Sequence, residues 1–246
     1  IGGVSFNAKD HGTWTANTYT VIFDANGGDG TMADQVMTYD RTQSLSANSF
    51  EREGYTFAGW TLDGADAGLT VGGEASIPVG GATYVAAFTA NEGIAYTVIT
   101  YKMNSDGTTY AETSETLYGT AGEPATAKTP AKEGFTLNAE KSILEGTVAA
   151  DNSVVLKVYI DRNSYMLTTV VDGVSTSTAY LYGSTVSEPA VPSKSEHKFI
   201  KWNGIIPETM PAENITVAAV FEKSYICPDC GDEILGEAEI NEHKSA

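Results

Sequence analysis

The chain has 246 residues, of which 41% are apolar, so it is long enough for more than one packed domain. Its formal net charge of −18 excludes a nucleic-acid-binding surface, which needs clustered Lys and Arg, and opposes adsorption to anionic membranes. The sequence contains no run of about 18 apolar residues, and it begins at Ile1 without a basic and apolar leader. We therefore expect a mature protein or an excised fragment that does not insert directly into a membrane.

Three similar units follow one another along the chain. They open with YTVIF at Tyr19, YTVIT at Tyr96 and YMLTT at Tyr165. Each unit closes with a β-branched and aromatic run, and these runs lie at residues 83–88, 154–160 and 215–221. Such residues favour strands, so we predict a mainly β fold of α+β type with about four strands per unit. At most one short helix per unit is expected, with residues 31–40 as a weak candidate in the first.

The joints before the first two units also repeat. Thr15-Ala16-Asn17 precedes the first unit and Thr89-Ala90-Asn91 precedes the second. Residues 1–17 therefore resemble the tail of an earlier unit.

Several aromatic residues recur at matching places in the units. Trp60 and Trp202 could stack on a sugar ring if they were exposed, but a recurring position favours packing in the core of a small β domain. We make the same prediction for the recurring tyrosines Tyr39, Tyr118 and Tyr182.

The Gly-rich segment Asp24–Gly30, DANGGDG, follows the first predicted strand. Asp24, Asn26 and Asp29 could be considered as calcium ligands, but an EF-hand loop needs a bidentate Glu at its twelfth position, where this chain has Gln35. Asn and Gly tolerate positive φ, so the segment is interpreted as a turn.

These motifs resemble a known family. YTVIFDANGG followed by EGYTFAGW is similar to the Listeria–Bacteroides repeat, the β-grasp-like B-repeat of bacterial surface proteins. The third unit is similar to the same family, although VVDGVS replaces its DANGG turn. The middle unit, with GEPATAKTPAKEGFTLN, resembles the mucin-binding-type repeat. The resemblance implies a secreted or cell-surface protein of a Gram-positive-type bacterium in which the units are spacers or adhesive modules.

The resemblance and the spacing together give a domain plan. We predict a tail of a preceding repeat or a linker, a Listeria–Bacteroides-type repeat, a mucin-binding-type repeat, a second Listeria–Bacteroides-type repeat and a zinc-finger-like segment. Their respective limits are residues 1–18, 19–90, 95–161, 165–222 and 225–246.

No catalytic constellation stands out. The three histidines, His11, His197 and His243, lie outside any nucleophile motif, and no phosphate-binding or dinucleotide-binding fingerprint is present. We therefore predict a protein that is not an enzyme, with no catalytic and no cofactor-binding residues other than metal ligands.

The only two cysteines, Cys227 and Cys230, form a Cys-x-x-Cys near the end of the chain. Three interpretations compete. A redox pair normally starts a helix in a thioredoxin-like βαβ unit, which the surrounding sequence does not resemble. A disulfide would close only a small loop and would stabilise little. The third interpretation is a metal site.

The metal interpretation adds His243, because twelve residues separate it from Cys230. The pattern resembles three of the four ligands of a two-Cys, two-His zinc finger, and the apolar frame matches as well. That frame consists of Tyr225, Ile234 and Ile240. In the family the fourth ligand follows the first His by four or more residues, which places it beyond Ala246. With six acids and one base in residues 225–246, the segment would repel DNA, so we predict structural zinc.

The sequence as a whole predicts a non-enzymatic bacterial surface or secreted repeat protein that acts as a spacer or adhesion module. The alternative is a carbohydrate- or mucin-binding module that uses exposed aromatic residues. The expected partner is a protein or glycan on a host or neighbouring cell surface, and nucleic acid is not expected.

Overall fold

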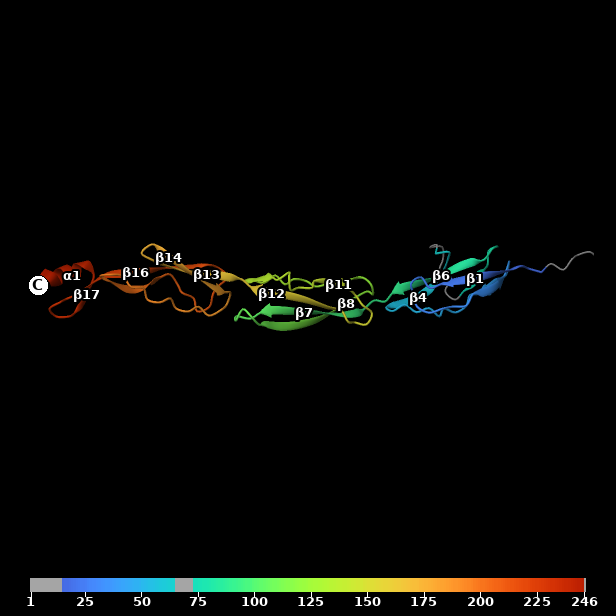
Figure 1. The fold of residues 1–246 in the computed structure, drawn as a ribbon, viewed down its shortest axis with the longest axis horizontal. Coiled ribbons are helices and arrows are strands. Elements are labelled where there is room, and N and C mark those ends of the chain that lie inside the picture. Colours follow the sequence, from blue (N-terminus) through green and yellow to red (C-terminus); the bar gives the residue numbers. More distant parts are fainter. Residues whose placement is uncertain (1–14, 65–72, 246) are drawn as a thin grey trace, which may run out of the picture. The chain divides into compact units, whose positions relative to one another are not determined.

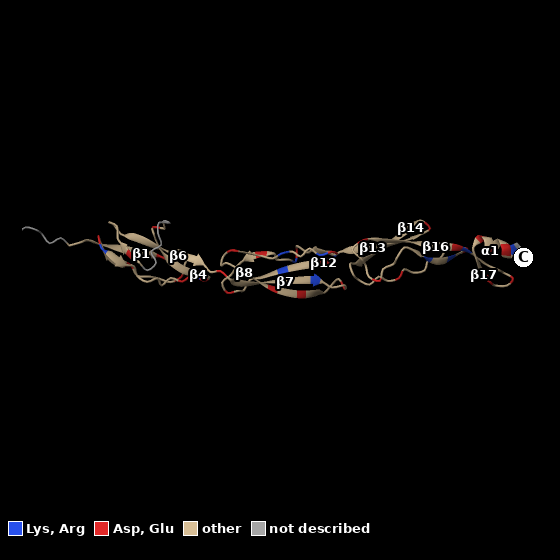
Figure 2. Cartoon of the chain, turned by 180° about the vertical axis from the view of Figure 1, so that it is seen from behind, with Lys and Arg blue, Asp and Glu red and all other residues tan. Residues whose placement is uncertain are grey.

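The computed structural model describes residues 15–64 and 73–245 (Figure 1). Residues 1–14 of the predicted tail at residues 1–18 lie outside the described residues. The chain divides into two compact units, whose boundary falls within the second of the three repeats. One contains the first repeat together with Leu117–Ala125 and Thr147–Val154, and the other contains the remainder of the middle repeat, the third repeat and the C-terminal segment. Acidic residues occur in all three repeats and in the C-terminal segment, with fewer basic residues among them (Figure 2).

The first repeat is a four-stranded sheet in the order β2-β1-β6-β4. Its first and last strands lie side by side in the centre and run parallel, with Val21 opposite Ala82 and Phe23 opposite Tyr84. The two outer strands pair antiparallel with them. The strands of this repeat are β1 (Thr18–Asp24), β2 (Gln35–Thr38), β3 (Thr42–Ser44), β4 (Tyr55–Leu62), β5 (Glu74–Ser76) and β6 (Ala82–Ala90).

This order is that of a β-grasp sheet, but no helix crosses it within the described residues. The short helix considered for residues 31–40 is wrong, because Gln35–Thr38 form β2. Here Met37 is buried while its neighbour Val36 is 63% exposed, which is the alternation of an edge strand with one covered face. The turn predicted at Asp24–Gly30 is confirmed, since Asn26 has a φ of 49° and donates its N–H to the Asp24 carboxylate at 2.7 Å.

The core of the first repeat is built around Trp60, which is only 1% exposed. Its ring contacts Phe23, Phe50 and Phe57, with centroid distances of 4.8, 6.1 and 5.1 Å. The prediction that this Trp is a core residue is therefore confirmed.

The middle repeat has the equivalent order, β10-β12-β7-β8. Its first and last strands are again parallel neighbours, with Val98 opposite Leu156 and Thr100 opposite Val158. Leu156, Val158 and Ile160 alternate along the last strand and are buried. The strands are β7 (Ile94–Met103), β8 (Tyr110–Gly119), β9 (Pro124–Thr126), β10 (Phe135–Leu137), β11 (Glu145–Thr147) and β12 (Val155–Arg162).

The third repeat has the order β14-β13-β16-β15, in which the first and last strands, β13 and β16, are parallel. Its core contains Leu167, Val186, Met210 and Val217, and the half-buried Trp202 packs against it. The elements are β13 (Ser164–Val171), β14 (Val174–Leu181), β15 (His197–Asn203) and β16 (Ile215–Ile226), followed by β17 (Glu233–Leu235) and the helix α1 (Glu237–Ser245).

The prediction that the recurring tyrosines are core residues is wrong for two of them. Tyr39 is 42% exposed and Tyr118 is 69% exposed. Tyr39 follows the last residue of the edge strand β2, beyond the covered face, and it contacts Tyr19 edge to face. Tyr118 lies on β8, the edge strand of the middle sheet. Tyr182 is half-buried, and its ring contacts Phe135 at a centroid distance of 5.8 Å.

Candidate metal centre

The two cysteines lie on a tight turn at the end of β16. That strand ends at Ile226, immediately before Cys227, and β17 pairs back onto it with Tyr225 opposite Ile234. Two backbone bonds close the turn: Gly231 donates to the Cys227 carbonyl at 2.9 Å, and Cys227 donates to the Asp232 carbonyl at 3.0 Å. Gly231 has a φ of 78°, a conformation that glycine adopts without steric cost. The turn brings both sulfur atoms to one side.

The third predicted ligand comes from α1. The helix follows Gly236, which has a φ of 85° and accepts a backbone bond from Ile240 at 3.0 Å. Ile240 is 3% exposed, and His243 lies three residues later on the same helical face. The acidic residues Glu237 and Glu239 in the first turn and the basic residues in the last turn suit the helix dipole. The sequence pattern thus directs His243 to the side of the helix that faces the turn.

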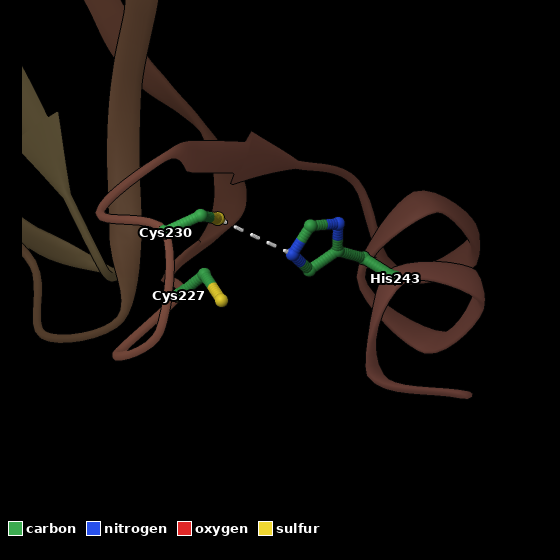
Figure 3. A group of neighbouring side chains, drawn as sticks. All are labelled: Cys227, Cys230 and His243. Atoms are coloured by element: carbon green, nitrogen blue, oxygen red, sulfur yellow. Dashed lines mark hydrogen bonds between the residues drawn. The ribbon is translucent and has the colours of Figure 1, made fainter. Parts of the chain in front are cut away.

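The structure brings the three predicted side chains together (Figure 3). One donor atom from each of Cys227, Cys230 and His243 lies within 4.8 Å of the others. The distance from Cys230 Sγ to His243 Nε2 is 3.6 Å. With Zn–S and Zn–N bonds of about 2.3 and 2.0 Å at tetrahedral angles, these two ligands should lie about 3.5 Å apart. The donor set therefore fits a zinc ion.

The electrostatics of the turn affect the two thiols differently. The backbone N–H of Cys230, followed by the His243 side chain, lowers the pKa of Cys227 to about 7. For Cys230 the backbone N–H of Asp232 favours the thiolate, but the neighbouring Cys227 side chain, burial and the Asp232 carboxylate outweigh it and raise the pKa. Because a metal is bound by thiolates, the lowered pKa of Cys227 favours coordination at neutral pH.

The surroundings of the cysteines bear on the redox interpretation. Both cysteines are free thiols. The Cys-x-x-Cys turn leads into β17, and α1 begins only at Glu237, seven residues after Cys230. The turn therefore lacks the helix N-terminus that activates the cysteine of a thioredoxin-like site.

Polar contacts connect this segment to the third repeat. Lys198 on β15 pairs with Glu233 on β17 at 2.5 Å, and the Ser224 hydroxyl donates to the same carboxylate at 3.0 Å. Lys223 pairs with Glu237 at 3.2 Å. All these side chains are exposed to solvent, which screens the ion pairs and weakens each of them. Together they give the segment a defined position on the end of β16.

A second group of side chains, which the sequence did not single out, lies on the middle repeat. The tyrosine cluster consists of Tyr101, Tyr110 and Tyr159. Tyr101 and Tyr159 stack at 4.4 Å with an interplanar angle of 10°, and Tyr110 meets Tyr159 edge to face at 5.3 Å. Register pairing places Tyr101 opposite Tyr159 on parallel strands, a relation that no local sequence pattern reveals.

Hydrogen bonds fix the tyrosine cluster on one side. The Tyr110 hydroxyl donates to Asp161 at 2.6 Å and accepts from Lys141 at 2.9 Å. Asn138 donates to the other oxygen of Asp161 at 2.6 Å. Burial, followed by the Asp161 carboxylate, raises the pKa of Tyr110, so its hydroxyl keeps its proton at neutral pH.

Comparison with known proteins supports a repeat architecture. The model of the Listeria-Bacteroides repeat domain family matches residues 19–76 and 165–220, within the first and third units. Two proteins of Evansella cellulosilytica are similar to this chain. One, a "Putative membrane protein", is 27% identical over 199 residues, covering 77% of this chain and 28% of that protein. The other, a "Putative Gly-rich membrane protein", is 25% identical over 204 residues, covering 77% of this chain and 23% of that protein.

The similarity to these relatives covers only part of their length. The chain spans about a quarter of the length of the relatives it matches. Within the described residues, no helix has the length and hydrophobicity needed to cross a bilayer. The resemblance of the outer units to Listeria–Bacteroides repeats is confirmed, whereas the mucin-binding-type middle unit and the zinc finger stay predictions.

Proposed function

We propose that the chain is a non-enzymatic part of a bacterial cell-surface protein, in which the tandem repeats act as a load-bearing spacer that presents adhesive surfaces. The repeat family of the outer units and the membrane-protein relatives support a surface location. The expected partners are proteins or glycans on a host or neighbouring cell. The net charge of −18 supports a role away from nucleic acid.

The observation that carries this proposal is the parallel pairing of the first and last strands in every repeat. The chain enters a repeat at the start of its first strand and leaves it at the end of its last strand. Tension along the chain therefore slides these parallel neighbours past each other, so their hydrogen bonds are loaded together. An antiparallel hairpin pulled at its open end would instead lose its bonds one after another.

Single-molecule stretching tests the spacer role. Pulling on the two chain ends should give three separate unfolding events, one per repeat. An extended chain spans about 3.4 Å per residue, so each event should add about 200 Å. The matched control pulls the first repeat through Glu53 and Ala90, which opens the antiparallel pair β4–β6 from the Tyr55–Ala90 end. Equal unfolding forces in the two geometries would contradict the proposal.

A second candidate function is carbohydrate binding, which the tyrosine cluster favours. Aromatic faces bind the apolar faces of sugar rings, and neighbouring polar groups such as Lys141 and Asn138 can bind hydroxyls. The site lies on the unit that resembles mucin-binding-type repeats. A role in packing the open face of the sheet is the simpler explanation, and a binding experiment separates the two.

The experiment compares binding to a glycan array, or to mucin-coated beads, for Tyr159→Ser and Tyr118→Ser. Tyr118 is a matched control because it is an exposed tyrosine of the same repeat with no part in the cluster. Carbohydrate binding through the cluster predicts that only Tyr159→Ser abolishes retention on the beads. Equal retention of both variants would leave the cluster a packing role.

We also propose that Cys227, Cys230 and His243 hold a structural zinc ion. A bound zinc would link the turn to α1, a helix of only nine residues that is marginal on its own. Cobalt added to the reduced protein should give a thiolate-to-metal absorption band that Cys230→Ser weakens and His197→Ala leaves unchanged. A band that is insensitive to Cys230→Ser would exclude this site.

A further inference from the structure

An asparagine joins the chain segments at the end of the first repeat. The backbone N–H of Asn91 donates to the Gly54 carbonyl at 2.8 Å, and the Asn91 carbonyl accepts from Ala121 at 2.9 Å. The Asn91 side-chain oxygen accepts from the Thr56 hydroxyl at 2.7 Å. One residue thus bonds to the turn that starts β4 and to a residue that follows β8. All of these atoms belong to one compact unit.

The same three bonds recur at the next joint, inside the other compact unit. Asn163 donates to the Gly134 carbonyl at 2.9 Å and accepts from Tyr182 at 2.8 Å. Its side-chain oxygen accepts from the Thr136 hydroxyl at 2.6 Å. We call this arrangement of three bonds the asparagine clamp.

The clamp has two halves, and the first, which we call the turn half, bonds to the N–H and the side-chain oxygen of the asparagine. This half has a sequence signature. It is a turn with a basic residue, Glu, a left-handed Gly, an aromatic residue and Thr, found as REGYT at Arg52–Thr56 and as KEGFT at Lys132–Thr136. Gly54 and Gly134 have φ values of 79° and 75°. The basic residue closes the turn by accepting a backbone bond from the aromatic residue at 3.0 and 3.1 Å, respectively.

The second half, which we call the carbonyl half, bonds to the backbone carbonyl of the asparagine and also has a fixed backbone form. The residues that donate to the asparagine carbonyl, Ala121 and Tyr182, are each followed by a glycine in the left-handed region, with φ values of 77° and 68°. The left-handed residue turns the chain away after the bond is made.

Asn17 has the carbonyl half of this clamp. Its carbonyl accepts from the Tyr39 N–H at 2.8 Å, and the next residue, Asp40, is left-handed with a φ of 58°. The residues before it, Thr15-Ala16, repeat Thr89-Ala90. Within residues 15–64 and 73–245, no group bonds to the N–H or the side-chain amide of the exposed Asn17.

We propose that Asn17 is one half of an asparagine clamp whose other half is a further repeat of this class, lying before it in the same polypeptide. That repeat presents a Gly-aromatic-Thr turn to Asn17, and its last strand ends at Thr15–Ala16. The connection is within one chain because Ala90 and Thr89, which precede the clamp residue Asn91, pair with Tyr55 and Thr56 of the turn half. The same pairing would hold Ala16 and Thr15.

A fusion protein tests this proposal without the natural neighbour. A second copy of residues 18–90, with its own REGYT turn, is joined directly to Asn17 of the chain, so that Ala90 replaces Ala16. Amide hydrogen exchange by NMR should show the Asn17 N–H protected at least about tenfold more in the fusion than in the original chain. The added repeat should also raise the urea midpoint of the original first repeat.

Substitutions distinguish the clamp from a general effect of the fusion. Asn17→Ala should remove the gain in urea midpoint in the fusion and should have little effect in the original chain. Thr18→Ala, at the exposed neighbouring position, should change neither protein. If the added copy does not fold, residues 95–162, with the KEGFT turn, take its place. An Asn17 N–H that exchanges equally fast with either folded repeat present and absent would overturn the proposal.

Discussion

Replacing Gly134 by Ala should destabilise the joint at Asn163 much more than the same substitution does at a left-handed glycine with open space around it. Gly134 is buried and has a φ of 75°, and an added Cβ would lie 2.2 Å from the Tyr182 ring. A left-handed conformation costs Ala about 1 kcal/mol, and forcing a methyl group into a packed site adds about 2 kcal/mol. We therefore expect Gly134→Ala to lower the free energy of unfolding by about 3 kcal/mol.

Gly173 provides a matched control for the backbone contribution. Its φ of 79° is nearly the same, but no heavy atom lies within 4 Å of an added Cβ. Gly173→Ala should therefore cost only about 1 kcal/mol. The assay is urea unfolding followed by hydrogen-exchange mass spectrometry, read in peptides that cover β10 and β14.

A double-mutant cycle isolates the ring contact. In a Tyr182→Ala background the ring is absent, so Gly134→Ala should cost about as much as Gly173→Ala, about 1 kcal/mol. Equal costs for Gly134→Ala and Gly173→Ala in the original background would refute the reasoning, because the packing at the joint would then be irrelevant.

Three further predictions follow from the core, the metal centre and one surface carboxylate. Trp60→Ala should destabilise the first repeat by about 4 kcal/mol, and Trp202→Ala should cost the third repeat less because Trp202 is only half-buried; equal losses in urea unfolding would contradict this. A zinc chelator should increase hydrogen exchange in α1 and leave β13 and β16 protected, whereas an unchanged α1 would argue against structural zinc. Bonds from Thr109, with a smaller contribution from Thr108, lower the pKa of Asp106 from 3.8 to about 2. The Asp106 carboxylate therefore stabilises the folded state above its unfolded pKa, and this contribution is lost as the pH falls through about 2. Asp106→Asn should flatten the acid dependence of unfolding in that range, and an unchanged acid profile would contradict the assignment.

Local patterns in the sequence were sufficient for part of the fold. The β-rich composition, the repeated openings and the turn at Asp24–Gly30 depend on residues near one another in the chain, and the structure confirms them. The grouping of Cys227, Cys230 and His243 was predictable for the same reason, because a turn, a short strand and a helix cover the whole distance. The prediction that the recurring tyrosines are buried failed where burial depends on position in the sheet, as at Tyr118 on the edge strand β8.

Relations between distant strands were not predictable in this way. Tyr101 and Tyr159 stack because β7 and β12 are parallel neighbours in one register, and a shift of one residue would place them on opposite faces. Asn17 and Asn91 were visible as a repeated Thr-Ala-Asn, whereas Asn163 follows Asp161-Arg162, and the bonds of Asn91 and Asn163 depend on a turn far away in the sequence. A repeated Asn next to a strand end, together with a repeated Gly-aromatic-Thr, is the signal from which such a joint could be recognised in other chains.

The joint at the end of the third repeat shows how this chemistry changes with the neighbour. Ser224 stands in the clamp position and donates its N–H to the Glu196 carbonyl at 2.8 Å, and Glu196 has the left-handed φ of 60° found for glycine in the other two joints. The side-chain bond differs, because Lys198 replaces Thr and pairs with Glu233 of the C-terminal segment. The Ser224 hydroxyl bonds to the same carboxylate. A backbone bond common to all three joints thus sets the connection. The side chain in the clamp position bonds to a Thr of the preceding repeat at the two joints between repeats, and to Glu233 of the C-terminal segment at the last joint.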